Sequence, residues 1–343
     1  MPSFILRRLA VGAVLAFLSG APAGDGYAFY EGKTIRMVVG FSAGGGFDAY
    51  SRALARHLPK HIPGNPTIIV ENMAGAGSLI SANHVYKVAK PDGLTIGHFI
   101  GGLFLNQLLD GPGIAFDARR FEFVGAPVKD TPVCVLTRAS GMTNIQNWMN
   151  APAPVKLGAL APGNSTYDHP KLLQDILGLP IQIVLGYKGT SDIRLAAEGG
   201  EIAGGCWTWD SIKATSGKAI ESGNLVVVLQ MTPQPIPDLP NVPLAIHYAK
   251  SQEGRRLIEA AIHDISDLMR PYALPPGTPQ DRVLILQRAF QDTLKDPAFL
   301  DETKKSKLTL DPVSGVELKN KVASLFDLSP SLKAKLKALL AAK

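Results

Sequence analysis

The 343-residue chain is poor in cysteine, in aromatic side chains and in clustered charge, and each shortage excludes a class of protein. Its two cysteines, Cys134 and Cys206, are too few for a disulfide-dense scaffold or a cysteine-based zinc cage. Lys and Arg number 35 against 29 Asp and Glu, but the basic residues are spread along the chain. We therefore expect no nucleic-acid partner, and His98 and His169 are not spaced as metal ligands.

Long apolar runs are equally scarce. The run LAVGAVLAFL at residues 9–18 follows two arginines and is ten residues long, whereas a membrane span needs about 20. Small residues follow it, and cleavage after Ala23 or Ala28 would suit their pattern. The order of charged, apolar and small residues predicts a signal peptide over residues 1–28 and a periplasmic mature protein.

The rest of the chain alternates strand, small-residue loop and helix. Thr34–Val39 has the composition of a strand, a glycine-rich loop follows, and apolar residues then recur at helical spacing. The same order returns from Thr67 and again in the middle of the chain, and a hydrophobic fraction of 46% can fill a substantial core. This alternation predicts an α/β fold with doubly wound, mostly parallel sheets. We expect one lobe from residues 29–131 plus 232–343 and another from 132–231.

Four loops place small residues where a strand is expected to lead into a helix: GFSAGGGFD, NMAGAG, APGNST and GYKG. Such a corner presents backbone N–H groups and the positive end of a helix dipole, which together suit a carboxylate. If the first two loops face the last two across a cleft, an anion could be held without any basic side chain. Some of these glycines are equally explained by close packing of strands and helices.

Two catalytic interpretations use the same loops. Gly40–Gly44 matches the G-x-S-x-G pattern of a serine hydrolase, which would need Ser42 as nucleophile and a base such as His247 or His263. That serine would follow the first strand, with no upstream segment to supply a second oxyanion donor. The Gly75–Gly77 loop is a weak match to a dinucleotide site because Ile80 replaces the third glycine, and we expect no cofactor.

Several of these segments together resemble one known family. The run IRMVVGFSAGGGFD, then VENMAGAG, then GNSTYDH, YKG and LPPGTP follow one another as in the Bug family, the TctC-type periplasmic solute-binding proteins of tripartite tricarboxylate transporters. The resemblance implies a two-lobed, type II-like Venus-flytrap fold without enzymatic activity. It also implies a small organic acid as ligand, membrane permease subunits as partners and a monomeric state. A sensory binding protein without a dedicated permease would have the same sequence features.

The resemblance further implies which residues contact the ligand. In the first lobe these are Phe41, Ser42, Ala43, Asp48, Ala74, Gly75 and Ala76. In the second lobe they are Asn164, Ser165, Thr166, His169 and Lys188. Two of them have an alternative role, because Asp48 could order the glycine loop and Lys188 could point to solvent. This chain departs from the family pattern at Ser165, at Gly186 and in the segment GCWTWD, and these departures concern the ligand more than the fold.

Three features of the segment GCWTWD leave alternatives open. Trp207 and Trp209 would share one face of a strand, either within the core or as a wall against a bulky acid. Asp210 could accept a hydrogen bond from the ligand or cap the next helix. Cys206 and Cys134 fall in the same expected lobe, where either a disulfide or two buried thiols would be compatible with export.

Overall fold

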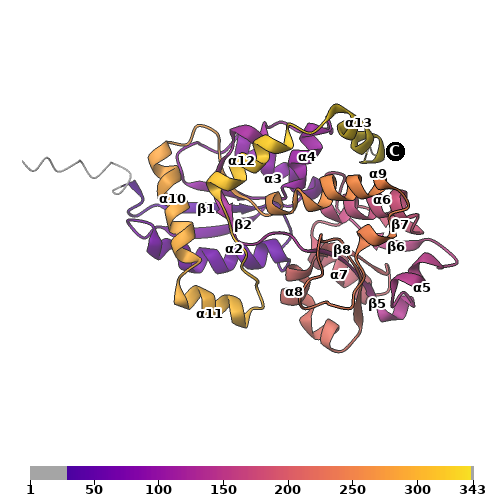
Figure 1. The fold of residues 1–343 in the computed structure, drawn as a ribbon. Coiled ribbons are helices and arrows are strands. Elements are labelled where there is room, and N and C mark those ends of the chain that lie inside the picture. The colour runs from indigo at the N-terminus through magenta and orange to yellow at the C-terminus, as the bar shows by residue number, and fades with distance from the viewer. Residues whose placement is uncertain (1–28, 341–343) are drawn as a thin grey trace, which may run out of the picture.

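A computed structural model describes residues 29–340, so the predicted signal peptide lies outside the described residues. The described chain forms two β-sheets, each flanked by helices, which lie side by side in Figure 1. This arrangement confirms the α/β, two-lobed fold expected from the sequence. Within these residues, no helix combines the length and the apolar character needed to span a membrane.

The first sheet has the strand order β11-β4-β10-β3-β1-β2. Its strands are β1 (Thr34–Val39), β2 (Thr67–Asn72), β3 (Thr95–His98), β4 (Glu122–Ala126), β10 (Tyr272–Leu274) and β11 (Val313–Ser314). β1 pairs in parallel with β2 and β3, whereas β10 pairs antiparallel with both β3 and β4. The sheet is therefore mixed, because β10 enters it from the opposite direction after the chain has returned from the second sheet.

The second sheet has the order β7-β6-β8-β5-β9. Its strands are β5 (Pro132–Thr137), β6 (Val155–Gly158), β7 (Ile181–Val184), β8 (Gly204–Thr208) and β9 (Leu225–Gln230). β6 pairs in parallel with β7 and β8, whereas β5, the first strand after the crossing from the first sheet, is antiparallel to β8 and β9. The strands of each sheet fall inside the lobe ranges expected from the sequence, and the limits of the lobes themselves stay a prediction.

Helices cover both faces of the first sheet. Those in its part of the chain are α2 (Gly46–His57), α3 (Leu79–Lys87), α4 (Gly102–Leu108), α10 (Gln280–Thr293), α11 (Pro297–Lys305) and α12 (Gly315–Leu325). Alternate residues of β1 point to opposite faces: Ile35 and Met37 pack with buried residues of α2 and α10, whereas Val38 packs with those of α3 and α4. Each face thus has its own apolar core, as expected for a doubly wound sheet.

The remaining helices lie with the second sheet. They are α5 (Ile145–Met149), α6 (Ser165–Leu177), α7 (Thr190–Glu198), α8 (Trp209–Glu221), α9 (Gln252–Ile258) and α13 (Pro330–Leu340). α13 contacts α6 and buries Leu336 and Leu340, although it comes from the part of the chain expected in the first lobe (Figure 1). This helix is rich in lysine and packs its buried leucines on a helix of the second lobe.

One expectation for the middle segment is wrong. β8 ends at Thr208, so Trp209 begins α8 and does not share a strand face with Trp207. The indole Nε1 of Trp209 donates to Asp238 at 3.0 Å instead. The alternating pattern could not show that the chain turns into a helix between the two tryptophans.

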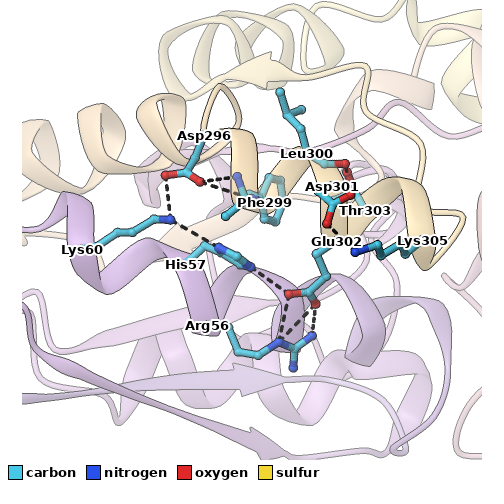
Figure 2. Close-up of polar contacts among 11 residues, drawn as sticks. Arg56, His57, Lys60, Asp296, Phe299, Leu300, Asp301, Glu302, Thr303 and Lys305 are labelled. Atoms are coloured by element: carbon cyan, nitrogen blue, oxygen red, sulfur yellow. Dashed lines mark hydrogen bonds and ion pairs between the residues drawn. The ribbon is translucent and has the colours of Figure 1, made fainter.

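Charged side chains connect α11 to α2 and to the turn Leu58–His61 that follows α2, as Figure 2 shows. Glu302 accepts from Arg56 and from His57, whose Nε2 lies 2.8 Å away, and the hydrogen bond from Arg56 holds the pKa of Glu302 below its ordinary value. Asp296 accepts from the first backbone N–H groups of α11 and lies 2.7 Å from Lys60, whose hydrogen bond lowers the pKa of Asp296. These contacts hold α11 against α2 at the outer edge of the first lobe, although the two helices are far apart in the sequence.

A disulfide joins Cys134 of β5 to Cys206 of β8, which lie directly opposite one another in the antiparallel pairing. The alternative of two free thiols, left open by the sequence, does not hold. The bond closes a loop over a sequence separation of 72 residues and ties the strand entering the second sheet to its centre.

We predict that breaking this disulfide lowers the free energy of unfolding by about 2–4 kcal/mol, because the cross-link restricts the unfolded chain. The test is urea denaturation of the wild type and of the double variant Cys134→Ala/Cys206→Ala, each with and without reductant. The wild type should lose stability on reduction, and the variant should not respond. Equal midpoints for all four samples would contradict the prediction.

Candidate functional site

A cavity lies where the carboxyl ends of parallel strands from both sheets face one another, which is the usual position of ligand sites in α/β folds. The first-sheet side contributes Phe41, Gly45, Gly46, Phe47, Ile100, Met269 and Arg270. The second-sheet side contributes Leu160, Asn164, Ser165, Thr166, Thr190, Trp207, Thr208 and Ser211, and Asp130 comes from the connection between the sheets. The cavity is narrow, with a volume of about 30 Å³, and the lobes touch beside it, where Ser42 Oγ lies 3.0 Å from Ser191 Oγ.

Four helices begin at this cavity: α2, α6, α7 and α8. The first N–H groups of a helix have no partner within it, and the helix dipole places partial positive charge there. Three of the four loops singled out in the sequence lead into these helices. The fourth, NMAGAG, lies outside the cavity and contacts lining residues through Gly77, whose carbonyl accepts from Asn164 Nδ2 at 3.5 Å, and through Asn72, whose Nδ2 donates to the Phe41 carbonyl at 2.9 Å.

Each of the four helices also carries an aspartate in its first turn: Asp48, Asp168, Asp192 and Asp210. Three of these carboxylates accept from the backbone of the preceding loop, at Gly44, Gly163 and Lys188, over distances of 3.0–3.1 Å. The protein thus uses these N–H groups to order its own loops. The sequence-based expectation that the loops alone present free N–H groups to an anion is wrong at these three positions.

The first-turn aspartates differ in their charge environment. Burial raises the pKa of Asp48, but hydrogen bonds from Arg52, Gly44 and Asn72 outweigh it and hold the pKa below its ordinary value. Asp168 has no such cation, and burial raises its pKa to about 7 against the opposing hydrogen bond from Gly163.

Arg270 supplies the positive charge of the cavity. Its side chain is 1% exposed and lies over the rings of Phe47 and Tyr50, with Cζ 4.7 and 5.3 Å from the two centroids. Nη2 donates to Ser211 Oγ at 2.7 Å, and Nε lies 3.4 Å from Asp130 Oδ1. Nη1 has no hydrogen-bond partner in the described chain although it is buried. A buried, unpaired guanidinium nitrogen is unfavourable unless a ligand supplies the acceptor.

Trp207 adds a second donor of the same kind from the other lobe. Its side chain is 5% exposed, and its Nε1 is buried without a partner among residues 29–340. Because Trp207 and Arg270 line the same cavity, one acceptor group could pair with both. Trp207 lines the cavity and is also buried among residues of the hydrophobic core, so both alternatives that the sequence left open for it are compatible with the structure.

The structure gathers some of the residues expected at the site and leaves others outside. Those that line the cavity are Phe41, Asn164, Ser165, Thr166 and Trp207. Those that do not line it are Ser42, Ala43, Asp48, Ala74, Gly75, Ala76, His169, Lys188 and Asp210. Ala43, Ala76 and Lys188 are exposed, so the one basic residue expected in the loops is exposed to solvent and does not line the cavity.

Three of the outside residues have structural roles in place of those considered. Asp210 lies within the first turn of α8 and accepts from Thr131 Oγ1 at 2.8 Å, so it neither caps the helix nor lines the cavity. His169 is buried in α6, where burial and the nearby His263 lower its pKa to about 3. Ser42 Oγ lies 3.0 Å from Ser191 Oγ and 3.4 Å from Asp192, and no histidine is among its partners within the described range, as a hydrolase would require.

Sequence reasoning missed Arg270 and Asp130. The signal for Arg270 was a single charge inside the otherwise apolar stretch LMRPYAL, because a charge in such a stretch is rarely buried without a partner or a function. Asp130 had no comparable signal. It lies in a connection whose place between the sheets depends on the tertiary fold. Within residues 29–340, no cluster of His, Cys, Asp and Glu is suited to hold a metal ion.

A two-lobed α/β fold with a polar cavity between its lobes is the architecture of a solute-binding protein. The family model described as the tripartite tricarboxylate transporter family receptor, TctC, matches residues 51–319. The chain belongs to this family.

Curated relatives are distant but extend along most of the chain. A UPF0065 protein of Bordetella bronchiseptica is 24% identical over 303 residues, which cover 86% of this chain and 82% of that protein. A UPF0065 protein of Agrobacterium vitis is 27% identical over 282 residues, which cover 79% of this chain and 74% of that protein.

Solved structures agree in fold. The periplasmic binding protein BugD superposes with a TM-score of 0.71 at 22% identity, covering 90% of this chain and 98% of BugD. MatC from Rhodopseudomonas palustris with bound malate gives 0.69 at 18% identity, covering 90% and 99% of the two chains. A further R. palustris protein, solved with adipate, gives 0.70 at 19% identity and covers 89% and 97%.

Glycines allow the lobes to approach closely. A Cβ atom at Gly46 would overlap the side chain of Ser211, and one at Gly189 would overlap Ser42 Oγ. The contacts across the cavity therefore require glycine at these two positions, because any Cβ atom would overlap the other lobe. Gly46 can be tested by substitution, because it begins a helix, where alanine is otherwise favourable.

We predict that Gly46→Ala leaves the fold stable but prevents full closure, so that ligand affinity falls at least about tenfold, or about 1.4 kcal/mol. Calorimetric titration and small-angle X-ray scattering measure the two effects. Gly217→Ala is the control, because a Cβ there meets only the flexible end of Lys307. Ser211→Gly should partly restore closure, and a ligand-bound Gly46→Ala protein as compact as the wild type would refute the argument.

We also predict that Asp168 makes the free energy of unfolding depend on pH. Its pKa of about 7 in the folded state exceeds the unfolded value near 3.9, so its contribution to stability is complete below about pH 4 and decreases as the pH rises through 7. When the pH rises from 5 to 8, the free energy of unfolding of Asp168→Asn should therefore fall by about 2 kcal/mol less than that of the wild type. Urea unfolding at both pH values measures this difference, and Asp175→Asn on the same helix is the control. Identical pH dependence in wild type and Asp168→Asn would contradict the assignment.

Proposed function

We propose that this protein is a periplasmic receptor that captures a small carboxylate-bearing solute between its lobes and delivers it to the permease subunits of a tripartite tricarboxylate transporter. A signal peptide over residues 1–28 would export it, and it would act as a monomer without enzymatic activity. The observation that carries the proposal is the pair of buried, unpartnered donors, Arg270 Nη1 and Trp207 Nε1, in one cavity between two sheets.

The chemistry of these donors favours a carboxylate. A guanidinium nitrogen and an indole N–H both donate, and neither can accept, so the missing partner is an acceptor group. Hydrogen bonds to ionised acceptors are about twice as strong as neutral ones, which favours an anion over a carbonyl or hydroxyl.

The proteins of similar fold support this ligand class. MatC of R. palustris was solved with malate and a second R. palustris protein with adipate, both of which are carboxylates. Membership in the transporter receptor family supports delivery to a membrane permease. Closure over the ligand would join surfaces of the two lobes into one face for that partner.

The proposal is tested by a thermal-shift screen of residues 29–343 against aliphatic mono-, di- and tricarboxylates, aromatic acids and amino acids. A ligand at 100 times its dissociation constant should stabilise the protein by about 2.7 kcal/mol, which is visible as a rise in melting temperature. Failure of every acid to stabilise the protein, combined with ester hydrolysis that Ser42→Ala abolishes, would replace the proposal with the hydrolase.

We predict that Trp207→Phe weakens binding of an acid identified in this screen by about 10- to 100-fold, because it removes one hydrogen bond to an anion and keeps the ring. Arg270→Gln should abolish detectable binding. Arg36→Gln is the matched control, since Arg36 pairs with Glu71 on the surface. Because Arg270→Gln leaves Asp130 without its cation, circular dichroism must show that it folds. Unchanged affinity in Trp207→Phe would contradict the assigned anchor.

A further inference from the structure

We propose that Asp130 determines specificity by limiting the ligand to one negative charge: the site takes an acid with a single carboxylate and a hydrogen-bond donor, such as an amide, hydroxyl or ammonium group, facing Asp130. This inference rests on the proposed function and narrows its ligand class.

The first step is the sharing of one cation. Among the described lining residues, Arg270 is the only cationic side chain and Asp130 the only anionic one. Asp130 is 8% exposed and already occupies the Nε edge of the guanidinium, at 3.4 Å. Ser211 takes Nη2, so one nitrogen of Arg270 is left for a ligand. A ligand carboxylate placed there is the second anion on the same guanidinium.

Charged groups outside the cavity lining also affect whether a second ligand carboxylate can bind. The positive ends of α2, α6, α7 and α8 could favour a further anion, but each of these helices already has an aspartate in its first turn. Two of these have a nearby cation: Arg52 for Asp48, and Lys213 for Asp210 at 3.8 Å. Three of these aspartates also accept from backbone N–H groups of the preceding loops, which leaves fewer N–H groups for a second ligand carboxylate.

The elements around Asp130 each place a polar or charged group near its carboxylate. Arg270, ahead of β10, is its cation; Thr208, at the end of β8, hydrogen-bonds to it; Asp210 of α8 repels it. Burial raises the pKa of Asp130 above its ordinary value despite the nearby Arg270. His98 is buried near Arg270, and burial together with that cation holds the pKa of His98 well below its ordinary value, so it supplies no positive charge.

Two consequences follow for a ligand with two carboxylates. One carboxylate would pair with Arg270 and Trp207, and the other would stand in the same small cavity beside Asp130, where like charges at a few ångströms repel strongly. Replacing that second carboxylate by an amide removes the repulsion and offers Asp130 a donor. An amide of otherwise identical shape should therefore bind better than the diacid.

The experiment compares acids of equal length by calorimetry at pH 7.5: succinate with succinamate, and adipate with adipamate. In the wild type we expect the amide of at least one pair to bind about tenfold or more tightly than its diacid. In Asp130→Asn the affinity for the diacid, relative to that for its amide, should increase at least about tenfold. Asp117→Asn, which removes the same charge from a surface ion pair with Arg119, should leave the ratio unchanged.

The outcomes separate the two proposals. A wild-type preference for the diacids, or a ratio that Asp130→Asn does not move, overturns the role of Asp130 and leaves capture of carboxylates intact. Absence of binding by both members of both pairs, together with a negative thermal-shift screen, overturns both. Asp130→Ser is measured alongside, so that a folding defect in Asp130→Asn does not decide the result.

Discussion

Burying a guanidinium removes it from water at a cost of several kcal/mol, which only good pairing can offset. Arg270 meets this condition with partners from several parts of the chain: the rings of Phe47 and Tyr50 in α2, Asp130 from the connection between the sheets, and Ser211 from α8. Ser211 belongs to the second lobe, so the full environment of Arg270 exists only when the lobes are closed. The buried charge and the closed arrangement therefore depend on each other.

Closure depends in turn on residues that have no side chain. Gly46 lets α2 approach α8, and Gly189 lets the loop before α7 approach Ser42. The hydroxyl contact between Ser42 and Ser191 then spans the two lobes at 3.0 Å. A glycine loop in this protein thus has two roles, because it turns the chain from strand to helix and also forms a surface on which the other lobe can close.

The sequence contained the local half of this arrangement. Strand composition and helical spacing placed β1 at Thr34–Val39, and three of the four small-residue loops did lead into helices that begin at the cavity. Local patterns allowed Asp48 to order its own loop but could not decide between that role and a ligand contact, and they could not show that Trp209 would leave the strand. They also could not place Arg270 and Asp130, which are distant in sequence and meet only because the chain crosses twice between the sheets.

The two unpartnered donors come from different lobes, and this has an energetic consequence. Trp207 lies at the end of β8 in the second sheet, whereas Arg270 immediately precedes β10 in the first. An acceptor that pairs with both must bridge the lobes, so part of its binding free energy stabilises the closed state. A solute that reached only one donor would leave the other buried and unsatisfied, a penalty of about 1–3 kcal/mol. Selectivity in such a site would therefore come as much from the penalty for incomplete pairing as from the contacts that a ligand makes.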